Sequence, residues 1–356
     1  PMTARTLTPR LLGVSLFAKE GGSQLTERGE LVAGYARQIL ALNDDMMLKL
    51  SSRESKGKLR FGIPNDYADH FLPRLMTSFA RDGTDITFEV VCDLSHNLLQ
   101  GLRKGRYDIV VAMTDPPLLG VVVCGAARLR QAKIVHWIQD IYPEVAAELT
   151  GRRSLLLLRP LRNWSWRRAG ACVVPGRDMA AAVTSSGVAP AKLHVSPNWA
   201  PCGLEPARQE QIAALREKWN LTGKFVLMYS GNLGRAHELD SLLEVAEGIR
   251  NDPAFALVFV GHGARKEALQ RAVRERGLPN VAFYPPQPRA DLAPSLGVAD
   301  VHFVTLKTGV ERWVFPSKLY GIAKVGRPVI FIGAATSEIA QCVQSAGMGE
   351  VFSTTE

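Results

Sequence analysis

The sequence predicts an α/β protein with two Rossmann-like units, the second nearly complete and the first incomplete or hybrid. Short apolar segments alternate with helical patterns from residue 58 to 112, and the alternation restarts after residue 203 and runs to residue 332. Strands that alternate with helices over short loops are typical of a mainly parallel sheet. A length of 356 residues and an apolar content of 46% are enough for two sizeable cores.

The N-terminal part is predicted to start with one long helix. Apolar side chains recur at helical spacing from Leu31 to Leu50, so we expect a helix over 27–50, ended by Gly57. The elements expected after it are strand 58–63, helix 70–81, strand 86–92, helix 95–104, strand 108–112 and strand 133–138.

The pattern restarts after a linker at 203–206. The elements expected there are helix 207–219, strand 224–229, helix 237–249, strand 256–260, helix 264–275, strand 280–284, helix 289–297, strand 300–304, helix 317–324, strand 328–332 and helix 336–346. This order predicts a Rossmann-like domain from its first strand nearly to its last.

Composition limits the function classes. The net charge of +9 is spread over both halves of the chain, so it is not a DNA-binding signature confined to one end. The five cysteines are scattered and form no CxxC pair, which argues against a zinc site or a disulfide framework and favours a reducing cytoplasm. The longest apolar run, 118–127, is about half of what spans a bilayer.

Two predicted strands run into glycine turns. One continues as Gly231-Asn232-Leu233-Gly234-Arg235, and the other as Gly261-His262-Gly263. Glycines let a backbone approach a ligand closely, free N–H groups at a helix start favour an anion, and ligands of open α/β sheets bind at the carboxyl ends of strands. The alternative is that these glycines only allow the chain to turn. His262 by itself is predicted to be a loop residue and not a catalyst.

A third segment carries Glu311 and then Pro316-Ser317-Lys318. Pro316 suits the first turn of a helix, the N–H groups of Ser317 and Lys318 would then point at a phosphate, and Lys318 would add charge. Glu311 is a candidate acceptor for sugar or ribose hydroxyls. The alternative for Lys318 is a solvated helix residue.

The order of these motifs is similar to the donor half of family-4 retaining glycosyltransferases with the two-domain GT-B fold. The segments that carry the resemblance are GNLG at 231–234, FVGHG at 259–263, NVAFYPPQ at 280–287 and PSKLYGIAKVGRPVIFIG at 316–333, with AMTDPPLL at 112–119, WIQDIYPE at 137–144 and VSPNW at 195–199 upstream. It spans about 108–352 and most resembles the bacterial O-antigen and capsule branch, including fucosamine-type transferases.

The resemblance implies a nucleotide-diphosphate sugar as donor and no obligatory metal or other cofactor. It implies catalytic roles for Glu311, Lys318 and Asp140, with Asp140 and Glu144 on the acceptor side. The donor-binding residues that it implies are Gly231, Asn232, Gly234, Arg235, Gly261, Gly263, Tyr284, Gln287, Pro316 and Ser317. The two glutamates that many relatives carry fall on Trp313 and Gly321, so Glu311 is the candidate substitute for the first.

An arginine-rich stretch lies at 152–168. It has six arginines and no acid, with leucines and two tryptophans between them. This composition favours the interface of an anionic membrane, and a buried helix with a basic solvated face is the alternative. The expected membrane-contact residues are Arg152, Arg153, Arg159, Arg162, Trp164, Trp166, Arg167 and Arg168.

The N-terminal 30% of the chain resembles a different family. LLGVSLFAKEGGSQLTERGELVAGYARQIL at 11–40 is similar to the wing and linker helix of LysR-type transcriptional regulators, and KLRFGIPNDYADHFLPRLMTSFARDG at 58–83 is similar to the start of their effector-binding domain. The expected organisation is therefore 1–57 LysR-like wing and linker helix, 58–107 partial effector domain, 108–202 partial acceptor domain and 203–356 donor domain. If the two pieces fold together, one hybrid sheet should connect 58–112 with strand 133–138.

The leading hypothesis is a retaining glycosyltransferase of bacterial cell-surface polysaccharide biosynthesis, impaired if the acceptor domain is incomplete. Its expected partners are a nucleotide-sugar donor and a lipid-linked or saccharide acceptor. A LysR-type regulator fragment and a non-catalytic nucleotide-sugar binder are the alternatives. DNA is not an expected partner, because the recognition helix that would enter the major groove is missing. A cytoplasmic location is expected, and the arginines allow contact with the inner face of the cytoplasmic membrane.

Overall fold

The computed structural model describes residues 26–36, 40, 57–64, 72–73, 75–78, 86–93 and 95–353. Contacts within the chain gather in two compact units: Pro1–Trp137 with Leu161–Cys172, and Ile138–Pro160 with Val173–Glu356. This division follows contacts and not ancestry, so the four predicted segments with boundaries at 57, 107 and 202 stay a prediction.

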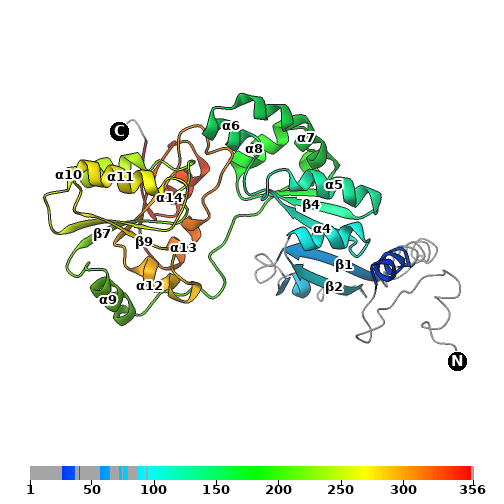
Figure 1. Cartoon of the computed structure of the whole chain (residues 1–356), viewed down its shortest axis with the longest axis horizontal. Coiled ribbons are helices and arrows are strands. Elements are labelled where there is room, and N and C mark those ends of the chain that lie inside the picture. Colours follow the sequence, from blue (N-terminus) through cyan, green and yellow to red (C-terminus); the bar gives the residue numbers. More distant parts are fainter. Residues whose placement is uncertain are drawn as a thin grey trace. The chain divides into compact units, whose positions relative to one another are not determined.

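The first sheet has six strands in the order β2-β1-β3-β4-β5-β6 (Figure 1). The pairs β1–β2, β1–β3 and β3–β4 are parallel. The strands are β1 Gly57–Pro64, β2 Ile86–Asp93, β3 Ile109–Met113, β4 Lys133–Trp137, β5 Ala171–Val174 and β6 Leu193–Val195. All four strands predicted here are confirmed, with ends that differ by one residue.

The helices that accompany this sheet were predicted only in part. The helices are α4 Ser95–Arg103, α5 Leu119–Leu129, α6 Glu144–Thr150, η1 Arg153–Leu158, α7 Arg159–Arg168, α8 Arg177–Ser185 and η2 Pro190–Lys192. Of these, only α4 was predicted. The described parts of the helices predicted over 27–50 and 70–81 are helical, and their other positions lie outside the described residues.

One sheet joins the segments that the sequence relates to two different families. β3 pairs with β1 on one side, with Phe61 opposite Ile109, and with β4 on the other side, with Ile109 opposite Lys133. The predicted continuity of the sheet from 58–112 to strand 133–138 is therefore confirmed, whereas the boundary at 107 that would make the sheet a hybrid stays a prediction. It is possible because ladder hydrogen bonds come from the backbone, so the ladder itself does not depend on which side chains the strands carry.

An ion pair joins the buried Arg60 on β1 to Asp108, which lies just before β3. We call this contact the seam. The Arg60 side chain is 9% exposed, and its Nη2 lies 2.6 Å from Asp108 Oδ1. Its Nε and its own backbone N–H both donate to Asp108 Oδ2, at 3.0 and 2.9 Å. Arg60 Nη1 also donates to the carbonyl of Gly105. The carboxylate and the guanidinium are thus satisfied inside one unit.

The second sheet has the order β12-β11-β10-β7-β8-β9, and every neighbouring pair is parallel. Its strands are β7 Phe225–Ser230, β8 Phe255–Val260, β9 Val281–Tyr284, β10 Val301–Thr305, β11 Val329–Ile332 and β12 Gly349–Phe352. Its helices are α9 Gln209–Lys218, α10 Asp240–Gly248, α11 Lys266–Arg276, η3 Arg289–Asp291, α12 Leu292–Gly297, α13 Lys318–Lys324 and α14 Glu338–Ser345. The predicted Rossmann-like order is confirmed, and only β12 was missed.

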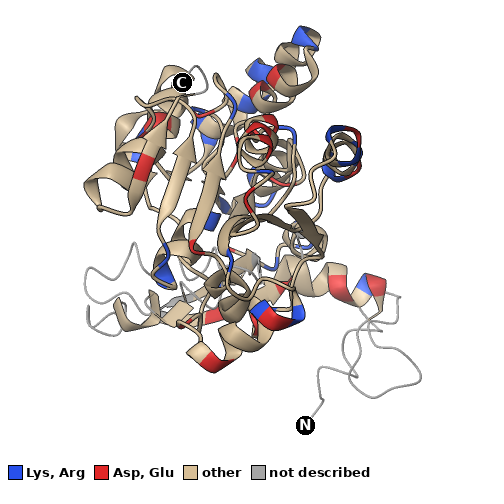
Figure 2. Cartoon of the chain, turned by 90° about the vertical axis from the view of Figure 1, so that its left-hand side faces the viewer, with Lys and Arg blue, Asp and Glu red and all other residues tan. Residues whose placement is uncertain are grey.

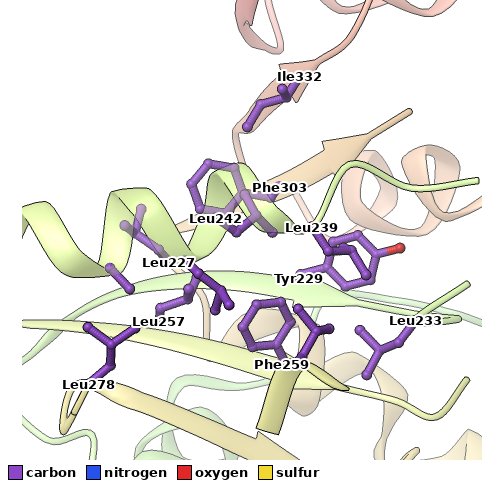
Figure 3. Packing of buried hydrophobic residues seen from close by; sticks show 13 residues of the cluster. Leu227, Tyr229, Leu233, Leu239, Leu242, Leu257, Phe259, Leu278, Phe303 and Ile332 are labelled. Atoms are coloured by element: carbon purple, nitrogen blue, oxygen red, sulfur yellow. The ribbon is translucent and has the colours of Figure 1, made fainter. Parts of the chain in front are cut away.

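The side chains of the second sheet alternate between two cores. Leu227 and Tyr229 of β7 pack with α10 on one face (Figure 3), whereas Val226 and Met228 pack on the other. Successive side chains of a strand point to opposite faces, so a strand buried on both faces must be apolar throughout. Charged residues accordingly lie mainly on helices and loops (Figure 2).

Candidate functional site

The strand order of the second sheet sets the place of the site. The chain runs from β7 to β8 and β9 on one side and from β10 to β11 and β12 on the other, so β7 and β10 flank the switch point where ligands of open α/β sheets bind. Two contacts join the segments that follow these strands. Lys307 N–H donates to Ala236 O at 2.9 Å, and His237 Nδ1 lies 2.7 Å from Thr305 O.

The two predicted glycine turns lie against each other at this edge. A Cβ atom on Gly261 would sit 2.0 Å from the carbonyl oxygen of Gly231, and one on Gly263 would sit 2.5 Å from Asn232 Oδ1. All three glycines have positive φ, at 135°, 147° and 149°. A residue with a side chain would be both strained and obstructed there, so glycine is required by the packing.

Backbone hydrogen bonds hold the two turns together. The N–H of Leu233 donates to His262 O at 2.7 Å, and the N–H of Arg265 donates back to Leu233 O at 3.0 Å. Gly261 N–H donates to Tyr284 O at 3.0 Å, which fixes the end of β9 beside the turn. The loops of the site are therefore hydrogen-bonded to one another without a ligand.

Lys318 lies under the first turn. Its Nζ is 3.6 Å from the ring centroid of Tyr229, and its Cε would be 3.2 Å from a Cβ on Gly231. The Nζ is buried and makes no hydrogen bond within the described part of the chain. Burial lowers the pKa of this ammonium well below its usual range. An anion at the turn would supply the missing partner and favour the charged form.

The aromatic side chains of Tyr229 and His237 lie close to Lys318 and the glycine turn. Burial raises the pKa of Tyr229 well above its usual value, and its hydroxyl donates to Asn232 O at 2.9 Å. Burial, with a smaller effect of the Lys318 charge, lowers the pKa of His237 to about 3. His237 is therefore neutral near pH 7 and serves as a structural hydrogen-bonding group. Sequence reasoning missed both residues, since Tyr229 falls in a predicted strand and His237 at the start of a predicted helix.

Glu311 lies in a separate cavity of about 560 Å³. Its Oε2 accepts a hydrogen bond from Gly309 N–H at 2.7 Å, and its Oε1 is buried with no partner among the described residues. The cavity is lined by Asp178, Ala181, Ala182, Ser185, Thr308, Gly309, Glu311, Arg312, Trp313, Ala334, Thr336 and Ser337. Lys318 and the glycine turns are not in this lining.

Asp140 is held next to the loop that carries Glu311. It forms an antiparallel bridge with Val314, and Ile141 N–H donates to Trp313 O at 2.8 Å. Further along, Arg159 Nε lies 2.8 Å from Glu144 Oε1, and this pair borders a second cavity of about 330 Å³. The structure thus brings Asp140 to the Glu311 loop by backbone contacts.

The remaining predicted donor residues are placed as follows. Arg235 and Asn232 are exposed beside the turn, and a Cβ on Gly234 would meet the Asn232 amide. Pro316 is buried and Ser317 is exposed directly before α13, which begins one residue later than predicted.

The Tyr284 side chain, at the end of β9, packs against Trp219. Its ring stacks on Trp219 at 4.0 Å, and its hydroxyl donates to Trp219 O. Gln287 Nε2 donates to Pro285 O at 2.7 Å. The backbone of this loop, and not the Tyr284 ring, is the part that lies beside Gly261.

The arginine-rich stretch forms η1 and α7, and it is only partly a surface. Arg162 and Trp166 are 4% and 3% exposed, with the guanidinium 3.8 Å above the indole ring. Arg159 forms an ion pair with Glu144. These three side chains were predicted to contact a membrane. Arg162 and Trp166 are buried, whereas the Arg159 side chain is 43% exposed although it is paired with Glu144. The exposed side chains of the stretch include Arg152, Arg153, Leu157, Arg167 and Arg168, while Trp164 is half-buried.

Two family models match separate parts of the chain. Residues 211–353 match the model of glycosyl transferases group 1, and residues 52–185 match the LysR substrate binding domain. The second match extends well past the predicted end of the LysR-like segment at 107. The chain therefore carries a C-terminal group 1 glycosyltransferase domain of the GT-B type and an N-terminal LysR substrate-binding-like domain.

Curated relatives repeat this division. The chain is 29% identical over 257 residues to "Probable glycosyltransferase WbjE" of Pseudomonas aeruginosa, covering 69% of the chain and 62% of the relative. It is 33% identical over 175 residues to WcaI of Escherichia coli (strain K12), named for colanic acid biosynthesis as a glycosyl transferase, covering 48% and 42%. It is 36% identical over 97 residues to the HTH-type transcriptional regulator DgdR of Burkholderia cepacia, covering 27% and 33%. The chain thus spans less than two thirds of each relative.

The fold is also similar to that of a solved structure, Anabaena HepE in complex with UDP and glucose. The TM-score is 0.63 at 15% identity, with 84% of this chain and 86% of that one covered. This likeness shows the fold. Among the described residues, no helix is long and apolar enough to cross a membrane, and no group of three metal-ligating side chains occurs.

Proposed function

We propose that this chain is a glycosyltransferase that takes a sugar from a nucleotide-diphosphate donor. The observation that carries the proposal is the buried Lys318 Nζ, which has no hydrogen-bond partner among the described residues and lies beside the glycine turn at Gly231. A buried ammonium is costly unless it is paired, and a pyrophosphate is an anion whose charge suits a buried lysine below a glycine turn at the carboxyl ends of parallel strands. The UDP complex of HepE supports this choice of donor.

The reaction that we propose proceeds with retention and without a metal. The bond between the anomeric carbon and the terminal phosphate oxygen breaks, and its electrons leave with the nucleotide diphosphate. A new bond forms from the same face between the anomeric carbon and an acceptor hydroxyl oxygen. The hydroxyl proton passes to the leaving phosphate. Lys318 would stabilise the charge that develops on that phosphate, and fixed charges are effective because they need no reorganisation.

The acceptor and the pathway are part of the same proposal. WcaI and WbjE support a role in cell-surface polysaccharide biosynthesis, with a lipid-linked or saccharide acceptor. We place the donor domain at 203–356 and a partial acceptor domain at 108–202, preceded by LysR-like segments at 1–57 and 58–107. A cytoplasmic location follows from the nucleotide-sugar donor.

Turnover tests the proposal directly. Lipid extract from a polysaccharide-producing bacterium and UDP-glucose, UDP-galactose, UDP-N-acetylglucosamine and UDP-N-acetylgalactosamine would be incubated with the chain, and the UDP released would be measured. Lys318→Met should lose turnover. Lys324→Met is the matched control, because Lys324 lies on the same helix and forms an exposed ion pair with Glu205. Equal turnover in Lys318→Met and wild type would refute the assigned role. Donor binding without turnover by wild type would favour a non-catalytic binder.

Peripheral membrane contact is proposed for the exposed part of the arginine-rich stretch. Arg152, Arg153 and the 81% exposed Leu157 belong to η1 and the residue before it, with no acid between Glu148 and Asp178. Basic side chains near exposed leucines favour anionic bilayers.

Vesicle sedimentation tests this contact with phosphatidylglycerol vesicles. Arg152→Gln with Arg153→Gln should lower binding. Arg271→Gln with Arg274→Gln removes the same charge from exposed positions on α11 and should not. Equal binding by both double variants would contradict the proposed contact.

A further inference from the structure

Two cavities of the second unit share one wall. Trp313 lines the cavity of about 560 Å³ that contains Glu311, and it also lines the cavity of about 330 Å³ beside α6. The second cavity is lined by Glu144, Ala147, Glu148, Gly151, Arg153, Leu156, Arg159 and Trp313. Both volumes lie in the range of small-molecule sites, about 300–1,000 Å³.

The backbone holds Trp313 firmly in this position. Its N–H donates to Val310 O at 2.8 Å, and its carbonyl accepts from Ile141 N–H at 2.8 Å. The next residue, Val314, forms the bridge with Asp140. The backbone on both sides of the Trp313 side chain is therefore held by hydrogen bonds.

The larger cavity has the chemistry of a sugar site. It carries the unpartnered Oε1 of Glu311, the hydroxyl-bearing side chains of Thr308, Thr336 and Ser337, and the indole of Trp313. Carboxylates and hydroxyl side chains bond the hydroxyls at the edge of a pyranose, and an aromatic ring packs on its apolar face. The loops after β10 and β11 form one side of this cavity, at the same sheet edge as the phosphate turns, and α8 forms the other side with Asp178, Ala181, Ala182 and Ser185.

The smaller cavity is lined by charged side chains from α6, η1 and α7. Glu144, Ala147, Glu148 and Gly151 are spaced three and four residues apart, so they share one face of α6 and its end. The Arg159 ion pair neutralises Glu144, which leaves Glu148 and Arg153 as the other charged groups. Four charged side chains around 330 Å³ are unsuitable for an acyl chain and suitable for a second ring with hydroxyls.

We propose that Trp313 separates two saccharide sites, with the glycosyl part of the donor in the larger cavity and the terminal ring of the acceptor in the smaller one. This inference rests on the proposed function and assigns its substrate sites. Trp313 is then a positioning residue that contacts both substrates.

The test measures the two ligands separately. The increment due to the donor sugar is the ratio of the Kd for UDP to the Kd for the tightest of UDP-glucose, UDP-galactose, UDP-N-acetylglucosamine and UDP-N-acetylgalactosamine. Acceptor-site binding is the saturation-transfer NMR signal of the methyl glycosides of glucose, galactose, N-acetylglucosamine, rhamnose and fucose, with UDP present. Trp313→Ala should lower the increment by about tenfold and remove the glycoside signal. Glu311→Gln should lower only the increment, and Glu148→Gln only the glycoside signal.

Controls separate this inference from the proposed function. UDP alone should bind all variants equally, and Trp313→Phe should keep both readouts within about threefold because it retains an aromatic face. If wild type does not bind UDP, the proposed function fails. If UDP binds but Trp313→Ala leaves either readout unchanged, or wild type shows no sugar increment or no glycoside signal in these panels, the two-site assignment is overturned.

Discussion

The two sheets have the same number of strands but differ in how their strands are buried and in the contacts between them. In the second sheet, the middle strands β7, β8 and β10 are almost wholly buried, and two apolar clusters cover their faces. In the first sheet, the edge strand β2 has exposed Thr87, Glu89 and Cys92, and the contact between β1 and the start of β3 includes the ion pair of Arg60 with Asp108. The first sheet therefore combines a continuous backbone ladder with one polar contact between β1 and the start of β3.

The largest effect is expected at the seam. Asp108→Ala would leave the Arg60 guanidinium buried without its carboxylate, which costs about 3–5 kcal/mol in the free energy of unfolding of the first unit. Urea unfolding followed by tryptophan fluorescence measures this loss. Arg276→Ala removes an exposed pair with Glu247 and should cost less than about 1 kcal/mol. Equal effects of the two variants would mean that the seam does not depend on this contact.

The second largest loss of stability is expected at the glycine turns of the second sheet. Gly261→Ala places a Cβ against Gly231 O at a positive φ, and should destabilise the second unit by about 2–4 kcal/mol and weaken UDP binding. Gly248→Ala, at the end of α10, meets nothing within 4 Å and serves as the control. Thermal unfolding with and without UDP gives both readouts. A Gly261→Ala protein as stable as the control would show that the turns can separate.

Acid should weaken the two sheets unequally. Burial lowers the pKa of His302 and of His136 to about 4, and that of His237 to about 3. Below the ordinary pKa of 6.5 the unfolded chain binds protons that the folded chain does not. Stability is therefore full above that pH and is lost as the pH falls toward 4.

Each of these histidines should cost about 2 kcal/mol at pH 5. Two of them lie in the second sheet region and one in the first. His302→Gln should reduce the loss of unfolding free energy between pH 7 and pH 5 by about that amount, measured by urea unfolding. An unchanged pH dependence would mean that His302 is protonated in the folded state.

The smallest expected change in unfolding free energy is a stabilisation. Lys318→Met removes a desolvated ammonium with no partner among the described residues, and should stabilise the ligand-free chain by about 1 kcal/mol. The unfolding free energy without nucleotide checks this, with Lys324→Met as reference. A destabilised Lys318→Met protein would indicate that the Tyr229 contact outweighs the desolvation cost.

Much of the fold was predictable, because it rests on local patterns. Apolar runs and glycine turns predicted all the strands of the second sheet except β12, and the turns at Gly231 and Gly261 do meet. The sequence did not predict that Trp313 lines two cavities, that Arg162 turns inward, or that Tyr284 packs on Trp219. Each of these depends on a tertiary neighbour, which local periodicity does not encode.

Isothermal titration with UDP tests most directly the claim that the switch point of the second sheet is a nucleotide-diphosphate site. Wild type should bind UDP at one site per chain. Lys318→Met should bind about 10–100-fold more weakly, since a hydrogen bond to a charged group contributes about 1.5–3 kcal/mol. Lys324→Met should match wild type. No binding of UDP by wild type, or equal affinity in Lys318→Met, would contradict the claim.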